Sequence, residues 1–147
     1  MIHKELAKLH EENQPIRIGV SGAGWIGSGF VTQVQHVKGM EVSVLADRDT
    51  SKAHQVFIDL GFTNEQIVET DSINNAEDSI NKRKIIITQD YTLASKLESI
   101  DIVADVTPSP EVGAETAFSC IQYKKNIVMV NIEADVNKKS KNRRKNA

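Results

Sequence analysis

The sequence predicts an α/β domain in which a doubly wound parallel sheet is covered by helices on both faces. Short apolar runs alternate with segments of helical period from residue 16 to residue 131. Strands that are buried on both faces are near-continuous apolar runs, so this alternation indicates a parallel sheet between two helical layers. A glycine-rich turn directly after the first run indicates the nucleotide-binding form of this architecture, the Rossmann fold. We expect the strand order 3-2-1-4-5, with a short helix ahead of the sheet.

The amino-terminal half is predicted from helical period and from helix-ending residues. A helix over residues 2–11 should end before Pro15, because proline cannot continue a helix. The first strand leads through the glycine turn into a helix at residues 25–37, which Gly39 ends. After the second strand, Ser51 is the expected N-cap of the next helix. The apolar residues expected on the inner faces of these helices are Ile2, Leu6, Leu9, Phe30, Val31, Val34, Ala53, Val56, Phe57 and Leu60.

The carboxyl-terminal half is predicted in the same way. Residues 63–70 suggest a turn with a short strand, and residues 72–83 a polar helix. Asp90 is the expected cap of a short helix, and a longer helix is expected at residues 111–124. The five main strands are predicted at residues 16–21, 41–46, 84–88, 101–106 and 126–131. The inward positions of these later helices are Ile73, Ala76, Ile80, Leu93, Leu97, Ile100, Val112, Thr116 and Cys120, with Tyr123 or Ile121.

Composition restricts the class of protein. The chain has 147 residues, of which 39% are hydrophobic and 26% charged, as in an ordinary single globular domain. No run approaches the roughly 18 apolar residues of a membrane helix, and the first residues do not resemble a secretory signal. We therefore expect no membrane partner and a cytoplasmic location. The single cysteine, Cys120, cannot form an internal disulfide and is expected to be a buried, reduced thiol.

The charge is distributed unevenly along the chain. Residues 137–147 hold six of the 18 basic residues and no acidic one, which leaves 12 basic against 20 acidic residues in the rest. We expect a disordered basic tail, because these residues cannot build a core. Nucleic-acid binding is not expected, since the acidic body would repel phosphates and no aromatic residue interleaves with the tail charges. The expected organisation is an amino-terminal helix at 1–14, a nucleotide-binding domain at 15–136 and this tail.

The glycine turn and an acid after it carry the predicted chemistry. Gly22 allows a tight turn, Gly24 lets the backbone approach a pyrophosphate, and Gly27 lets the helix pack closely on the strand. The helix N-terminus then faces the phosphates. Asp47 ends the second strand 20 positions after Gly27, as expected for an acid that accepts hydrogen bonds from the ribose of the dinucleotide NAD. Arg48 favours the 2′-phosphate of NADP instead, so the choice between NAD and NADP stays open.

The remaining candidate residues lie around the same cleft. Trp25 and Ile26 belong to the glycine turn, while Thr107 and Pro108 end the fourth strand, where a nicotinamide ring would lie. Histidines lack metal-ligand spacing, so no metal site is expected. The acids that follow the last strand, Glu133 and Asp135, are interpreted as solvated loop residues. A methyltransferase that uses S-adenosylmethionine is the weaker alternative, because Val20 and Ser21 stand where its first strand carries an acid.

Five segments together resemble a known family. They are similar to homoserine dehydrogenase-like NAD(P)-dependent oxidoreductases, and they are the helix at residues 2–11, the run from Pro15 to Phe30, the Leu45-Ala-Asp-Arg48 segment, residues 106–115 and residues 126–136. Within that family they resemble the branch of deoxyxylulose-phosphate reductoisomerase-like proteins and SAF-domain oxidoreductases. The resemblance covers residues 2–136 and corresponds to the amino-terminal Rossmann domain alone.

The resemblance also implies what is missing. Relatives continue past Val136 into a catalytic and dimerisation domain, whereas this chain turns into the basic tail. We therefore expect a truncated cofactor-binding domain that is inactive alone, and we assign no catalytic residue. The alternative is a stand-alone NAD(P)(H)-binding module or subunit. Expected partners are the dinucleotide and either a second copy or a chain that supplies the missing domain.

Overall fold

Residues 2–130 are described by the computed structural model of the chain. Its strands are β1 (Ile16–Ser21), β2 (Met40–Ala46), β3 (Ile67–Glu69), β4 (Ile85–Thr88), β5 (Ile102–Asp105) and β6 (Asn126–Met129). Its α-helices are α1 (Ile2–Glu11), α2 (Trp25–Gln35), α3 (Thr50–Asp59), α4 (Ile73–Asn81) and α5 (Pro110–Gln122), with 3-10 turns at Asn64–Gln66 and Ala94–Lys96. The expected tail, Glu133 and Asp135 lie outside the described residues.

All six strands form one parallel sheet in the order β3-β4-β2-β1-β5-β6. This corrects the predicted five-strand order 3-2-1-4-5. The extra member is β3, which pairs with β4 at the sheet edge through Ile67, Val68 and Glu69. A short strand was expected within residues 63–70, and β3 confirms it, but so short a run does not indicate its partner, so it was left out of the predicted strand order. The five longer strands keep the expected relative order.

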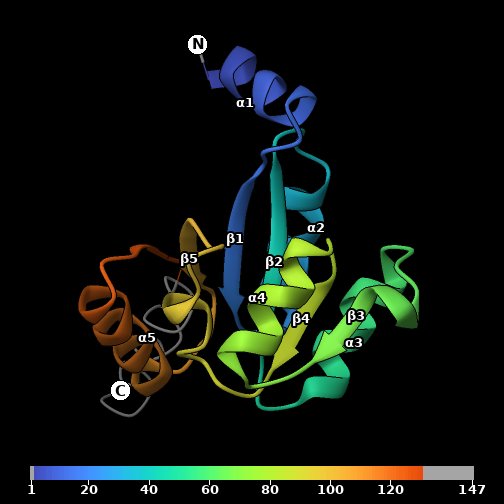
Figure 1. The fold of residues 1–147 in the computed structure, drawn as a ribbon. Helices are drawn as coiled ribbons and strands as arrows, with labels where there is room; N and C mark the ends of the chain where they lie inside the picture. Colours follow the sequence, from blue (N-terminus) through green and yellow to red (C-terminus); the bar gives the residue numbers. More distant parts are fainter. Residues whose placement is uncertain (1, 131–147) are drawn as a thin grey trace, which may run out of the picture.

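Helices cover both faces of the sheet, so the doubly wound architecture is confirmed (Figure 1). On one face, Val31 and Val34 of α2 and Phe57 of α3 pack against apolar residues of the central strands. On the other face, Ile80 of α4 and Cys120 of α5 pack with the residues around the second 3-10 turn. Two core clusters, one per face, therefore hold the sheet between them.

Three local predictions are wrong. Helix α3 begins at Thr50, and its N-cap is Asp49, whose side chain accepts from the backbone N–H groups of Ser51 and Lys52. The short helix expected after Asp90 is only a 3-10 turn, although Leu93, Leu97 and Ile100 are all buried as expected. The inward positions Ile73, Ile121 and Tyr123 are exposed. Ile73 is the first residue of α4 and Tyr123 is the C-cap of α5, while Ile121 follows the buried Cys120 and is exposed together with Phe118 one turn earlier.

Helix α1 lies beyond the amino ends of β1 and β2 (Figure 1). None of its residues is buried, and Ile2 is 66% exposed. Its main fixed point is Gly39, which has a φ of +87° and whose Cβ, if present, would lie 2.2 Å from the Leu6 carbonyl oxygen. None of the described helices is long and apolar enough to cross a membrane.

Candidate functional site

The carboxyl edge of the sheet brings three predicted segments together. The N–H of Gly22 donates to the Ala46 carbonyl of β2 (2.7 Å), and the N–H of Val106 donates to the Ser21 carbonyl of β1 (2.9 Å). The glycine turn after β1, the residues after β2 and the residues after β5 are therefore adjacent. Ligands of open α/β sheets bind at this edge, where the strand order reverses.

Each glycine of the turn has a distinct structural reason. Gly22 has a φ of +108° and lies against Thr107, so a side chain there would be both strained and crowded. A Cβ on Gly27 would lie 2.0 Å from the Gly22 carbonyl oxygen, so only glycine allows α2 to pack this closely on the turn. A Cβ on Gly24 would meet nothing within 4 Å. The space above Gly24 is therefore open to a ligand.

The first turn of α2 is free to receive an anion. Gly24 is the N-cap of this helix and makes no side-chain hydrogen bond to it. The first turn contains no acidic residue. The unpaired N–H groups and the positive end of the helix dipole thus remain available beside the open space at Gly24. Phosphate groups bind at such positions.

Asp47 is tied to the glycine turn. Its Oδ2 accepts from the N–H of Ala23 at 2.7 Å, and its Oδ1 accepts from the N–H of Asp49 at 2.8 Å. These two hydrogen bonds fix the carboxylate between the turn and the start of α3. Each carboxylate oxygen has a further lone pair, so Asp47 can still accept hydrogen bonds from ligand hydroxyl groups.

Arg48 is exposed, and its backbone N–H donates to the Tyr91 hydroxyl at 3.0 Å. Tyr91 follows β4, so this bond joins the loops after two neighbouring strands. The Arg48 side chain makes no hydrogen bond or ion pair among the described residues. It is therefore free to interact with a ligand at this edge.

The Thr107 side chain, unlike that of Arg48, is engaged in hydrogen bonds within the protein. It is buried, and its hydroxyl donates to Asp105 Oδ1 at 2.8 Å, while its N–H donates to the same oxygen at 3.0 Å. Within residues 2–130, Asp105 Oδ2 is buried without a hydrogen-bond partner. Pro108 is exposed beside it. Thr107 therefore shapes the loop, and Pro108 is the residue of this pair that faces solvent.

The two large turn residues point in different directions. Trp25 is 87% exposed, whereas Ile26 is partly buried against the core on the α2 side of the sheet. Trp25 also lines a shallow hollow of about 330 Å³ between the glycine turn and α3, where Lys52 and Gln55 lie opposite. Ile26 thus has a packing role, and Trp25 is available to a ligand.

Sequence reasoning missed Ala23, Tyr91 and Asp105. The first contributes only its backbone N–H, and the second comes from a loop that has no recognisable motif. The acid two residues before Thr107 was a usable signal, because an acid at that spacing often binds the following backbone N–H and hydroxyl. Among the described residues, no group of three His, Cys, Asp or Glu side chains could hold a metal ion.

Comparisons with known proteins agree with this architecture. No protein-family model matches the chain, and no curated protein matches it. Among solved structures, myo-inositol dehydrogenase from Lactobacillus casei, in complex with NAD(H) and myo-inositol, is 19% identical, with a TM-score of 0.57 over 78% of this chain and 28% of that chain. The scyllo-inositol dehydrogenase of the same organism, with NAD(H) and scyllo-inositol bound, is 15% identical, with a TM-score of 0.56 over 78% and 27% of the two chains.

At these identities the likeness shows the fold alone, which is a Rossmann-type α/β domain. This chain spans little more than a quarter of the length of the two structures. Both are inositol dehydrogenases, so the comparisons do not support the more specific resemblance to the homoserine dehydrogenase-like branch.

Proposed function

We propose that this chain is the dinucleotide-binding domain of an NAD(P)-dependent oxidoreductase. The observation that carries the proposal is the hydrogen bond between the Ala23 N–H and Asp47 Oδ2, which fixes the acid beside the open space at Gly24. In this arrangement the pyrophosphate would lie over the first turn of α2 and the adenosine ribose at Asp47. The nicotinamide ring would lie toward Pro108.

The choice between NAD and NADP rests on two adjacent residues. Asp47 would accept hydrogen bonds from the ribose hydroxyls and would repel a 2′-phosphate. Arg48 has a free side chain at the same edge and would attract that phosphate. We propose that the domain binds both cofactors and that Arg48→Ala weakens NADPH more than NADH.

The binding experiment uses the single tryptophan of the chain. Trp25 lies beside the proposed pyrophosphate site and is 87% exposed, so bound NADH, which absorbs at the tryptophan emission wavelength, should quench its fluorescence. Saturable quenching by NADH or NADPH, relieved by NAD or NADP in excess, is the expected result. No saturable signal with either cofactor, together with no heat of binding in calorimetry, would overturn the proposal.

A pair of glycine variants makes the test specific. A Cβ on Gly24 or on Gly29 meets no atom within 4 Å, so neither variant should disturb the fold. Gly24→Ala places a methyl group in the proposed pyrophosphate space, and NADH affinity should fall about tenfold or more. Gly29→Ala, inside α2, should keep wild-type affinity and raise stability by about 0.5–1 kcal/mol. Equal affinities of the two variants would contradict this placement.

We assign no catalytic residue, so the domain is proposed to bind the cofactor without turning over a substrate by itself. Hydride transfer needs a substrate held against the nicotinamide, and that orientation supplies a large part of the rate. The homoserine dehydrogenase-like branch is kept as a proposal that rests on the sequence segments alone. The free, buried thiol of Cys120 favours the proposed cytoplasmic location.

The second candidate function is a stand-alone NAD(P)(H)-binding module or a subunit of a larger enzyme. The exposed apolar residues of α5 and β6, among them Phe118 and Met129, favour a subunit. Co-purification of a second chain that confers dehydrogenase activity on this one would establish the subunit function. Cofactor binding without any such partner would favour the module.

A further inference from the structure

A second pocket lies at the opposite end of the sheet from the glycine turn, at the amino ends of the strands. Its volume is about 430 Å³, which falls within the range of small-molecule sites. It exists because β2 begins at Met40 but pairs with β4 only from Val44 onward. The stretch before Val44 therefore has a strand neighbour on the β1 side alone, and the gap on the other side is open.

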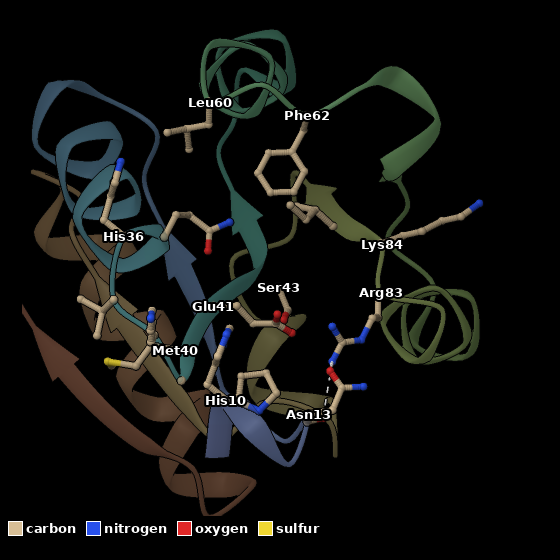
Figure 2. A pocket seen from close by; sticks show the side chains of 16 residues that line it. His10, Asn13, His36, Met40, Glu41, Ser43, Leu60, Phe62, Arg83 and Lys84 are labelled. Atoms are coloured by element: carbon tan, nitrogen blue, oxygen red, sulfur yellow. Dashed lines mark hydrogen bonds between the residues drawn. The ribbon is translucent and has the colours of Figure 1, made fainter. Parts of the chain in front are cut away.

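The lining of this pocket includes the hydroxyl of Ser43, which has no hydrogen-bond partner among the described residues. Ser43 is the extra residue at a register shift, since Ile18 pairs with Val42 and the next residue of β1 pairs with Val44. The Ser43 residue is only 3% exposed. Figure 2 shows Ser43 near the middle of the residues that line the pocket. Within residues 2–130 the buried side-chain atoms that lack a partner are Asp105 Oδ2 and Thr116 Oγ1, so the Ser43 oxygen is reached by solvent from the pocket and is available to a ligand.

Most charged side chains around the pocket are cationic. Among the described residues, Glu41 is the one acidic side chain that lines it, and it is paired with Arg17 at 3.2 Å. Lys38, Arg83 and Lys84 also line it, and none of them forms an ion pair within residues 2–130. Figure 2 shows the guanidinium of Arg83 turned inward to Asn13, whose Oδ1 it contacts, and the Lys84 ammonium turned outward. Arg83 keeps further N–H groups available.

The carboxyl ends of α1, α2, α3 and α4 all point to the same region and oppose an anion, since residues from each end line the pocket. Each helix end contributes roughly half a negative charge, so together they about offset the full charges of Lys38 and Arg83. An anion would therefore be held by direct hydrogen bonds from Arg83 and neighbouring donors rather than by a net positive field.

The rest of the lining suits a compact organic body. The Phe62 ring faces the pocket (Figure 2) and is fixed by an edge-to-face contact with Phe57, with ring centroids 5.5 Å apart. Gln35 accepts from the Val42 N–H at 3.2 Å through Oε1, which leaves its amide NH₂ as a donor. The pocket thus offers an apolar wall, neutral donors and an arginine.

From this chemistry we infer that the amino-end pocket binds a small organic anion, with a carboxylate or phosphate group held by Arg83 and Ser43 and an apolar body against Phe62. The site is separate from the proposed dinucleotide site, since the two lie at opposite ends of the same strands. It requires no covalent step.

The test titrates the whole chain with benzoate, phenyl phosphate and uncharged benzamide while recording amide NMR spectra. Benzoate or phenyl phosphate should shift the amides of Gln35, Ser43 and Arg83 in a saturable way, and benzamide should bind at least tenfold more weakly. The tighter of the two anions identifies the preferred head group. Equal responses to benzamide, or unsaturable shifts spread over surface lysines, would overturn the proposal.

Variants localise the site. Arg83→Gln should weaken anion binding about tenfold, whereas Lys82→Gln, an exposed neighbour paired with Asp78, should leave it unchanged. Ser43→Ala removes only the unpartnered hydroxyl, so it should weaken binding while the melting temperature stays at or above that of wild type. If Arg83→Gln and Ser43→Ala both bind as wild type, the cations only stabilise the ends of the helices, and the inference is wrong. NADH titrations of the same variants should be unchanged.

Discussion

At the scale of single residues, Gly27 illustrates how strictly the glycine turn is packed. A Cβ at this position would lie 2.0 Å from the Gly22 carbonyl oxygen and 3.1 Å from a Val106 methyl group. Gly27→Ala should therefore push α2 away from the turn and lower the free energy of unfolding by about 3 kcal/mol or more. Urea denaturation of Gly27→Ala measures this loss. Gly29→Ala is the control, because it should be at least as stable as wild type. A Gly27→Ala variant of normal stability would show that the turn is looser than described.

Cys120 gives a second residue-scale prediction. It is fully buried in the core on the α5 side, and burial raises the pKa of its thiol while Lys125 opposes this more weakly. A thiol reagent at neutral pH should therefore react only at the rate of unfolding. Because the folded pKa is raised, the thiol contributes stability below the unfolded value of about 8.5, and this contribution is lost as the pH rises toward the folded value. Rapid labelling of the native chain would contradict this burial.

At the scale of elements, α3 and α4 end in the same kind of turn with different residues. After α3, Gly61 has a φ of +97°, and the N–H of Phe62 donates to the Phe57 carbonyl. After α4, Arg83 has a φ of +63°, and the N–H of Lys84 donates to the Ser79 carbonyl. Glycine is the favoured residue at this left-handed position.

A matched pair of variants tests the two helix ends. Gly61→Ala should cost about 1 kcal/mol from backbone strain alone, because its Cβ would meet nothing within 4 Å. Arg83→Gly should raise the free energy of unfolding by about 0.5–1 kcal/mol, and it should also abolish the anion binding inferred above. Urea denaturation of both variants measures the first effect. A loss of stability in Arg83→Gly would show that its contact with Asn13 outweighs the strain.

The elements also show what the sequence could predict. The predictions of the five longer strands and of α2, α3 and α5 are confirmed. Each of these three helices has buried residues along one side and a capping or helix-ending residue. The short strand β3 was expected, but its place at the sheet edge was not, and the 3-10 turn at Ala94–Lys96 was expected as a helix. Neighbours in the fold decide how such short segments pair or coil. The residues of the glycine turn and Asp47 were predicted from spacing. The Asp47–Ala23 bond and the Arg48–Tyr91 bond depend on how three strands align, which no local pattern carries.

At the scale of the whole molecule, the sites at the two ends of the sheet differ in how well the sequence predicts them. The site at the carboxyl edge follows from the glycine motif of one strand-turn-helix unit and from Asp47. The amino-end pocket is assembled from four separate parts of the chain, which range from His10 to Ile85. Its key polar group, Ser43, lies among the apolar residues Val42, Val44 and Leu45 of β2 and belongs to no recognisable motif. Only the register shift in the sheet distinguishes it.

The exposed apolar surface over α5 and β6 leads to a prediction about the whole chain. Phe118 and Ile121 are 70% and 74% exposed on adjacent turns of α5, and Val128 and Met129 of β6 are 51% and 47% exposed. Within residues 2–130, β6 pairs only with β5, so its other edge offers free backbone groups. An edge strand beside apolar side chains favours association with a second copy. Sedimentation velocity should therefore show a concentration-dependent increase in mass.

Two substitutions test whether this surface causes the self-association. Phe118→Ser with Ile121→Ser should shift the chain toward monomer with little change in stability, because both side chains are already largely in water. Ile73→Ser on α4, where the isoleucine is 43% exposed, is the matched control and should leave the association unchanged. A chain that stays monomeric at every concentration would contradict the prediction. Association that survives the double substitution but not the control would locate the contact at the α4 side instead.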